Sequence, residues 1–273
     1  MRWILYAASA LVGLAGFQLF VLSEQTATTF AWTVKSFLTA ASLGAAYWSA
    51  VPVEFLAARQ RVWAQARVSV PGVWVFTTLT LILTILHADL FHFSSPDAVP
   101  RTAAYLWLAI YAGVPVAMLV AVFMQLRTPG GDPPIEHPLP AWLRIAFVAE
   151  GVGAAAVGLA LFVVPDAMRP LWPWGLTTLT ARAIGAWLIA IAVLLFHAYR
   201  EGDLARIRPV GGGLTLFGLI ELVALARYPG EMAWAAPAAW LYLIFLASLL
   251  PIGLFAWFAP NKLWNRRMPR RVD

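Results

Sequence analysis

Long apolar runs, separated by short polar segments, extend along the whole of this sequence. Eight of them reach the length of about 20 residues that a helix needs to cross the hydrocarbon core of a bilayer. Backbone groups cannot stay unpaired in lipid, so runs of this length are predicted to be helices. The sequence therefore predicts an all-α fold, a polytopic integral membrane protein with eight transmembrane helices near residues 3–22, 35–57, 70–87, 103–124, 142–164, 176–199, 210–226 and 238–258.

The composition agrees with this fold class. Apolar residues make up 62% of the chain and charged residues 12%, whereas charged residues are about a quarter of an ordinary soluble domain. The chain has no cysteine, which excludes disulfides and thiolate metal sites. The segments between the apolar runs are short, so no soluble catalytic domain is predicted.

Basic residues alternate between the connecting segments. One set of segments holds 14 of the 19 lysines and arginines, and the other set holds Lys35, Arg101, Arg169, Arg182 and Arg227. The positive-inside rule places the richer set, and with it both termini, in the cytoplasm. The basic tail over 261–273 is predicted to anchor to anionic lipids of the inner leaflet, with a partner-binding motif as the alternative. No nucleic-acid partner is predicted.

The two halves of the sequence resemble each other. Gly44 corresponds to Gly185, the pair Phe55 and Arg59 to Phe196 and Arg200, and Arg67 to Arg206. A Pro- and Gly-rich segment at 129–140, which is typical of a stiff non-helical linker, separates them. We therefore predict two parallel four-helix repeats, 1–128 and 141–260, related by a pseudo-two-fold axis along the membrane normal. The basic tail at 261–273 follows the second repeat.

One stretch resembles a known kind of membrane protein. Arg182, Gly185 and Trp187, followed by the polar turn at 200–208, look like small four-helix bacterial membrane families of the DoxX-like kind. The phrases LHADLFHF at 86–93 and WPWGLTTLTARAIGAW at 172–187 are similar to uncharacterised eight-span bacterial proteins. The resemblance implies a bacterial plasma (inner) membrane location. The 17 arginines against two lysines suit the genome of a GC-rich bacterium. It implies no particular chemistry.

Three ionisable residues lie well inside apolar runs of the second half. They are Glu150, Arg182 and Glu221. Inserting a charged side chain into the membrane costs about 2.5–3.5 kcal/mol, so each of the three is expected to have a function or a partner. The corresponding positions of the first half are uncharged (Ala8, Ala41 and Leu81 or Ile82). Two carboxylates sharing one guanidinium would leave one acid protonated, which suggests a proton- or cation-binding site. The alternative is a structural ion pair that joins three helices.

A second cluster lies at the outer end of the third apolar run. His87, Asp89 and His92 carry side chains that bind Zn²⁺ or Cu²⁺, and such a site would need a further ligand such as Glu231. The alternative is an interfacial group of polar side chains, because residues five apart diverge on a helix. Glu54 and His197 lie near the cytoplasmic ends of their runs, where snorkelling or hydrogen bonding at the interface is expected to satisfy them.

Three classes of function fit these features. A small transporter or permease with an ionisable site in the second repeat is favoured, because charged residues within the membrane and a duplicated architecture are typical of transporters. An accessory or assembly subunit packed beside other membrane subunits is the first alternative. A membrane redox or metal-dependent enzyme using the outer His/Asp cluster is the second. No hydrolase, nucleotide-binding or metalloprotease signature occurs, so no cofactor is predicted and a catalytic role is disfavoured.

Overall fold

The computed structural model describes residues 1–267, with 260–267 described by their backbone alone. The described chain is helical and contains no β-strand. Three short helices, α2 (Thr26–Thr29), α4 (Trp63–Ala66) and α8 (Pro165–Met168), and several 3₁₀ turns lie in the connections. Each of the eight predicted apolar runs corresponds to one long helix, namely α1 (Arg2–Phe20), α3 (Phe37–Arg59), α5 (Val70–Leu86), α6 (Ala98–Leu126), α7 (Ala141–Val163), α9 (Thr178–Glu201), α10 (Leu204–Arg227) and α11 (Pro237–Arg267).

Local sequence signals set several helix boundaries. The Ser36 hydroxyl accepts a hydrogen bond from the backbone N–H of Thr39 at the start of α3, and Thr177 and Thr180 form a reciprocal cap at the start of α9. Both satisfy N–H groups that have no partner within the helix. Gly202 ends α9 in the left-handed conformation, with φ of +66°, which a residue with a Cβ adopts only at a cost. Asp203 then caps α10.

Six of the long helices, α1, α6, α7, α9, α10 and α11, are long and apolar enough to cross a membrane. By length and composition the chain is therefore a multi-pass integral membrane protein. The two remaining helices fall short for different reasons. With 17 residues, α5 is about 26 Å long at 1.5 Å per residue, less than the roughly 30 Å hydrocarbon core. In α3, 14 of 23 residues are buried, and Thr39, Ser42 and Glu54 are among them. These polar side chains face protein instead of lipid.

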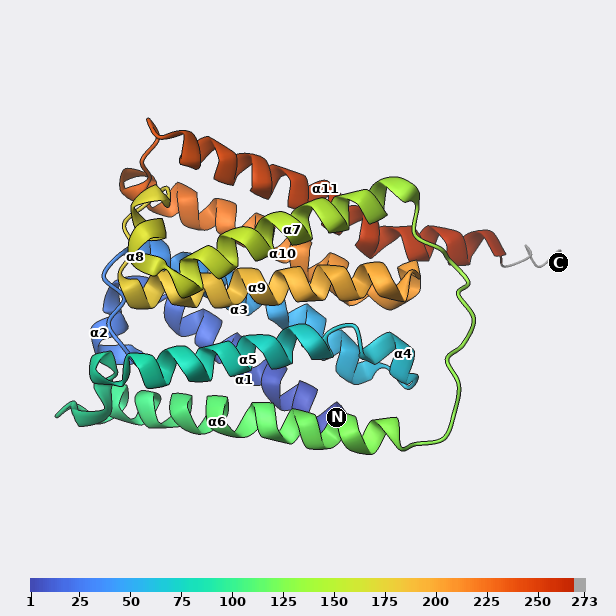
Figure 1. The fold of residues 1–273 in the computed structure, drawn as a ribbon, viewed down its shortest axis with the longest axis horizontal. Helices are drawn as coiled ribbons and strands as arrows, with labels where there is room; N and C mark the ends of the chain where they lie inside the picture. Colours follow the sequence, from blue (N-terminus) through green and yellow to red (C-terminus); the bar gives the residue numbers. More distant parts are fainter. Residues whose placement is uncertain (268–273) are drawn as a thin grey trace, which may run out of the picture.

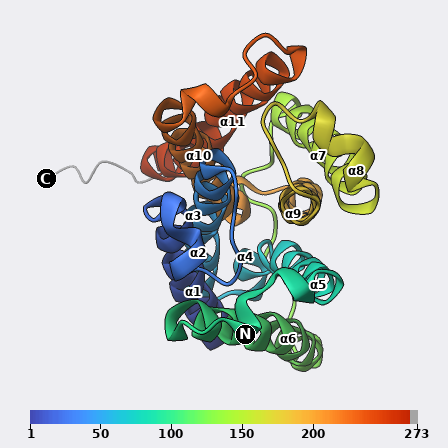
Figure 2. The same ribbon diagram turned by 90° about the vertical axis from the view of Figure 1, so that its left-hand side faces the viewer.

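The long helices form an inner and an outer group. More than half of the apolar stretch of α9 (61%) and of α10 (56%) is buried, against 22–28% for α1, α6, α7 and α11. In each half of the chain the first two long helices pack together, α1 on α3 and α7 on α9, and so do the last two, α5 on α6 and α10 on α11. Between the halves, α3 packs on α10 and α5 packs on α9. Figure 2, which looks along the helices, shows α1 and α6 at one side of the bundle and α7 and α11 at the other.

The connecting segments gather at two ends of the bundle. In Figure 1 the long helices lie side by side, with α2 and α8 at the left-hand end. At the right-hand end lie α4, the segment that joins α6 to α7, and the C-terminal end of α11. The segments at this right-hand end belong to the arginine-rich set recognised in the sequence. The last part of the predicted basic tail, residues 268–273, lies outside the described residues.

The linker at 129–140 is non-helical, as predicted, but it is more than a spacer. Its backbone pairs with the turn between α9 and α10, where Leu139 N–H donates to Gly202 O (3.0 Å) and Leu204 N–H donates to His137 O (2.8 Å). The Asp203 carboxylate accepts from the backbone N–H of Glu136 at 2.8 Å. These bonds hold the linker against the second half of the chain.

An ion cluster at the same end joins the two halves. Glu201, which is almost fully buried, accepts hydrogen bonds from Arg67 of the first half and from Arg206 of the second. The Arg206 side chain also donates to the linker carbonyl of Pro133, and Arg67 forms a second ion pair, at 2.7 Å, with Asp132. Hydrogen bonding to Glu201 raises the pKa of Arg67 above its usual value. One arginine from each half of the chain therefore pairs with the same buried carboxylate.

Candidate binding cavity

A partly open cavity of about 120 Å³ lies among helices from both halves. Its walls come from α1, α3, α5 and α6 of the first half and from α9 and α10 of the second. Most of the lining is apolar, including the aromatic side chains of Phe76, Trp107 and Trp187. The volume is comparable to the roughly 150 Å³ of an engineered apolar cavity that binds benzene. The cavity is thus large enough for a ligand built on a single ring.

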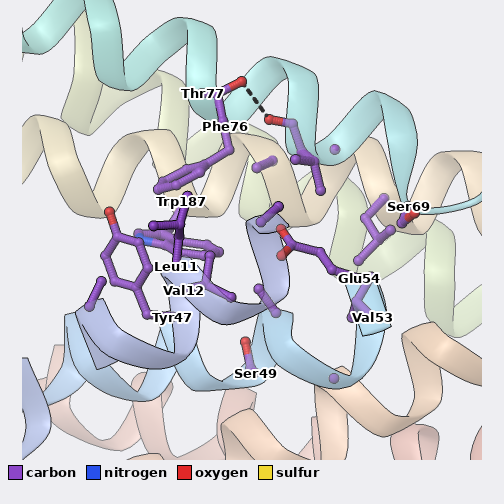
Figure 3. Close-up of a pocket in the computed structure, with 18 of the residues that line it drawn as sticks. Leu11, Val12, Tyr47, Ser49, Val53, Glu54, Ser69, Phe76, Thr77 and Trp187 are labelled. Atoms are coloured by element: carbon purple, nitrogen blue, oxygen red, sulfur yellow. Dashed lines mark hydrogen bonds between the residues drawn. The ribbon is translucent and has the colours of Figure 1, made fainter. Parts of the chain in front are cut away.

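Glu54 of α3 is the one ionisable carboxyl group in the cavity wall. Its side chain is 2% exposed, and Figure 3 shows its carboxylate turned inward, toward the side of the cavity where Tyr47 and Trp187 lie. The Oε2 atom has no hydrogen-bond partner among the described residues. This corrects the expectation that interfacial hydrogen bonds satisfy Glu54. The other residue of that expectation, His197, is 3.3 Å from Glu201 in the ion cluster.

The hydroxyl groups around Glu54 are already hydrogen bonded within the protein. Tyr47 and Tyr111 pair with each other at 2.6 Å. The hydroxyls of Ser49, Ser69 and Thr77 donate to carbonyls of their own helix or turn. Unpartnered buried polar atoms are rare because they lose their interactions with water. Glu54 is therefore the group of this wall that is set up to receive a partner from the cavity.

Aromatic rings from four helices line the cavity together with Glu54. The rings of Phe76 and Trp187 lie with centroids 3.9 Å apart, and Tyr47 packs edge-on against Trp187 at 5.1 Å. The Trp107 indole N–H donates to Thr84 at 3.0 Å, which fixes that ring beside Tyr111, with centroids 4.4 Å apart. These contacts hold the rings in place where they line the cavity.

A groove between α1 and α6 adjoins this cavity. Leu11, Ala15, Trp107 and Ile110 line both. Leu14 and Leu106, which are more than half exposed, line the outer part of the groove. Few contacts join α1 to α6, so the cavity lies next to an apolar opening in the outer surface of the bundle.

A similar groove lies between α7 and α11 in the second half. It is lined by Glu150, Gly153, Ala154 and Val157 of α7 and by residues of α11 that include Tyr242. The Glu150 carboxylate accepts a hydrogen bond of 2.5 Å from the Ser248 hydroxyl. Unlike Glu54, this acid has a protein partner.

The three charged residues singled out in the second half have separate partners. Arg182 donates to the carbonyl of Phe162 at 3.1 Å and contacts Nε2 of His87 at 2.6 Å. Glu221 is fully buried and accepts from the Ser42 and Tyr242 hydroxyls. No ion pair among the described residues joins Arg182 to Glu150 or Glu221. The structural ion pair is thus not formed, and the binding role of the three residues stays a prediction.

The outer histidine cluster is also dispersed. His87 contacts Arg182, and both ring nitrogens of His92 are engaged, one by Thr33 and the other by the carbonyl of Phe30. Glu231 accepts from the Ser36 hydroxyl and from two backbone N–H groups at the start of α3, so it caps that helix. Within the described residues, no group of three His, Asp or Glu side chains is placed to hold a metal ion.

Three of the cavity residues form a helical pattern that can be recognised in the sequence. Tyr47, Ala50 and Glu54 are spaced i, i+3 and i+7, which places them on one face of a helix. All three line the cavity. The sequence does not show which helices face this pattern. Trp107, Tyr111 and Trp187 come from α6 and α9, which are distant from α3 along the chain.

The Tyr47–Tyr111 pair provides a test of this wall. Tyr111→Phe is expected to lower the free energy of unfolding by about 1–3 kcal/mol, because it leaves the Tyr47 hydroxyl buried without a partner. Adding Tyr47→Phe is expected to recover part of that loss, since no polar group is then left over. Reversible unfolding in mixed micelles measures both. Costs that simply add would show that the two hydroxyls do not interact.

Comparison with known proteins gives no family for this arrangement. No protein-family model matches the chain, and neither a curated protein nor a solved structure matches it.

Proposed function

We propose that this protein is a small membrane transporter or permease whose substrate occupies the cavity between the two halves. The observation that carries the proposal is the buried Glu54 carboxylate, whose Oε2 has no partner among the described residues and which faces a ligand-sized space. Sites at the interface between two halves, with an ionisable residue in the membrane, are typical of transporters. A binding role for Glu150, Arg182 and Glu221, which have separate hydrogen-bond partners, stays a separate prediction.

The proposal includes eight membrane-crossing helices arranged as two parallel repeats of four. Glycine contacts support it. A Cβ on Gly72 of α5 would meet Ala190 and Leu194 of α9, and a Cβ on Gly213 of α10 would meet Ser49 and Val53 of α3. Gly213 follows Gly72 by 141 residues, and the same interval separates Ser49 from Ala190 and Val53 from Leu194. The contact from α5 to the second half thus has the same register as the contact from α10 to the first.

The residues that line the cavity and the α7–α11 groove support the same relation. Residues 8, 11, 12 and 15 of α1 line the cavity between the halves, and residues 150, 153, 154 and 157 of α7, each 142 positions later, line the groove between α7 and α11. Two halves with an even number of spans share one orientation, so their axis would lie along the membrane normal. The likeness of each half to DoxX-like four-helix proteins is part of this proposal.

The basic end of the bundle is proposed to face the cytoplasm of a bacterium, across its plasma membrane. The arginine-rich connections gather at the end that holds α4 and the linker, and such segments stay on the cytoplasmic side during insertion. Anionic inner-leaflet lipids are then the partners proposed for the basic tail.

Labelling of single cysteines tests transport directly, because the chain has no cysteine of its own. Ser49→Cys, in the cavity wall, is expected to react with a membrane-impermeant thiol reagent in both right-side-out and inside-out vesicles, since a transporter opens its site to each face in turn. Ser9→Cys is the matched control, because Ser9 is buried and does not line the cavity. Labelling of Ser49→Cys from one face or from neither would contradict transport and favour an accessory subunit.

A further inference from the structure

The chemistry of the cavity is complementary to a cation. A carboxylate in apolar surroundings is costly unless a charge or hydrogen-bond donors accompany it. The described residues supply Glu54 with no ion pair, and the neighbouring hydroxyls of Ser49, Ser69 and Thr77 are bonded elsewhere. An ammonium group would supply both charge and donors.

The aromatic wall fits the same ligand. A cation within about 6 Å of a ring centroid is attracted to the face of Trp, Tyr or Phe, most strongly to Trp. Trp107, Trp187, Tyr47 and Phe76 all line the cavity with Glu54. A ligand that places its ammonium beside the carboxylate would therefore have aromatic surface around its apolar part.

The size and surroundings of the cavity limit the ligand further. Its volume of about 120 Å³ suits a single ring or a short branched chain. The adjoining groove between α1 and α6 is lined by exposed apolar residues such as Leu14 and Leu106, on helices that face lipid. A strongly hydrated cation would lose its water at a high cost in such apolar surroundings, so a lipophilic cation is favoured.

We propose that the cavity binds a protonated lipophilic amine of about the size of one ring, with its ammonium group on Glu54 and its apolar part among Phe76, Trp107 and Trp187. The proposal rests on the proposed function, because it names the substrate class of the same site.

Calorimetric titration of the full-length protein in lipid nanodiscs, with empty nanodiscs subtracted, tests this class of ligand. The probes are benzylamine, which is protonated at neutral pH, and benzyl alcohol, which has nearly the same shape and no charge. Benzylamine is expected to bind roughly tenfold or more tightly than the alcohol, because a hydrogen bond to a charged group contributes at least that much. Equal binding of the two, or no binding of benzylamine, would overturn the proposal.

Two variants locate the binding. Glu54→Gln keeps the shape of the side chain and is expected to remove the preference for the amine. Ala50→Leu fills the cavity wall while leaving Glu54 intact, and it is expected to weaken binding of benzylamine at least tenfold; it provides the test if Glu54→Gln does not fold. Glu150→Gln changes the acid of the other groove, which already bonds to Ser248, and is expected to keep the preference. Loss of the preference in Glu150→Gln but not in Glu54→Gln would place the binding in the α7–α11 groove and overturn the proposal.

The amine proposal and the transport proposal fail in different ways. If Ser49→Cys is labelled from both faces and the wild-type protein shows no preference for benzylamine, transport stands and the substrate class is wrong. If benzylamine binds through Glu54 and Ser49→Cys is labelled from neither face, the ligand class stands and transport is wrong.

Discussion

Replacing Glu201 by glutamine is expected to lower the free energy of unfolding by about 3–5 kcal/mol, the cost of removing one partner from a buried ion pair. Glu201 is 4% exposed and is the shared acceptor of Arg67 and Arg206. The neutral amide would leave both guanidinium groups, one from each half, without their common counter-charge. Unfolding in mixed micelles, followed by circular dichroism, measures the change.

Asp132→Asn is the matched control for this variant. Asp132 pairs with the same arginine, Arg67, but its side chain is 47% exposed. Exposed ion pairs contribute about 0–1 kcal/mol and are weakened by salt, so this variant is expected to stay within about 1 kcal/mol of the wild type. If Glu201→Gln lowers the free energy of unfolding no more than Asp132→Asn does, the buried cluster does not hold the two halves together.

Gly44→Ala is expected to destabilise the protein by about 1–3 kcal/mol or more, because a Cβ at this position collides with backbone. The added atom would lie 2.5 Å from the amide nitrogen of Phe20 and 2.9 Å from its Cα. Backbone atoms cannot turn aside as a flexible side chain can, so α1 and α3 would have to separate. Gly185→Ala is expected to act in the same way, because its Cβ would lie 2.7 Å from the carbonyl oxygen of Gly158.

Gly113→Ala provides the opposite control in the same kind of helix. A Cβ on Gly113, within α6, would meet no atom within 4 Å, and alanine is favoured over glycine in a helix by about 0.5–1 kcal/mol. This variant is expected to be neutral or slightly more stable than the wild type. A loss at Gly113 as large as the loss at Gly44 would contradict close packing of α1 on α3 as the cause, because a Cβ on Gly113 has no neighbour to collide with and helix propensity favours the alanine. The midpoint of unfolding in mixed micelles distinguishes the two cases.

The ionisable residues illustrate why the candidate site was only partly predictable. A charge exposed to lipid is costly, so an acidic residue in the middle of an apolar run is expected to be buried in protein. Glu221 is fully buried. Its partners, Ser42 and Tyr242, come from α3 and α11, which no spacing rule connects to it. Arg182 was expected to approach a carboxylate and instead contacts His87, at the end of α5. A contact between helices depends on which helices are neighbours and on how each is turned about its axis.

Much of the architecture could be read from the residues alone, because the properties involved are local. The length of an apolar run predicts a helix wherever the run lies, and each of the eight runs is one long helix. The alternation of arginines likewise predicts which connections share an end of the bundle. The cavity depended on folding in three dimensions. A single residue turns a helix face by about 100°, so only the packed arrangement of α1, α3, α5, α6, α9 and α10 determines that Glu54 faces aromatic rings and leaves its Oε2 unpaired.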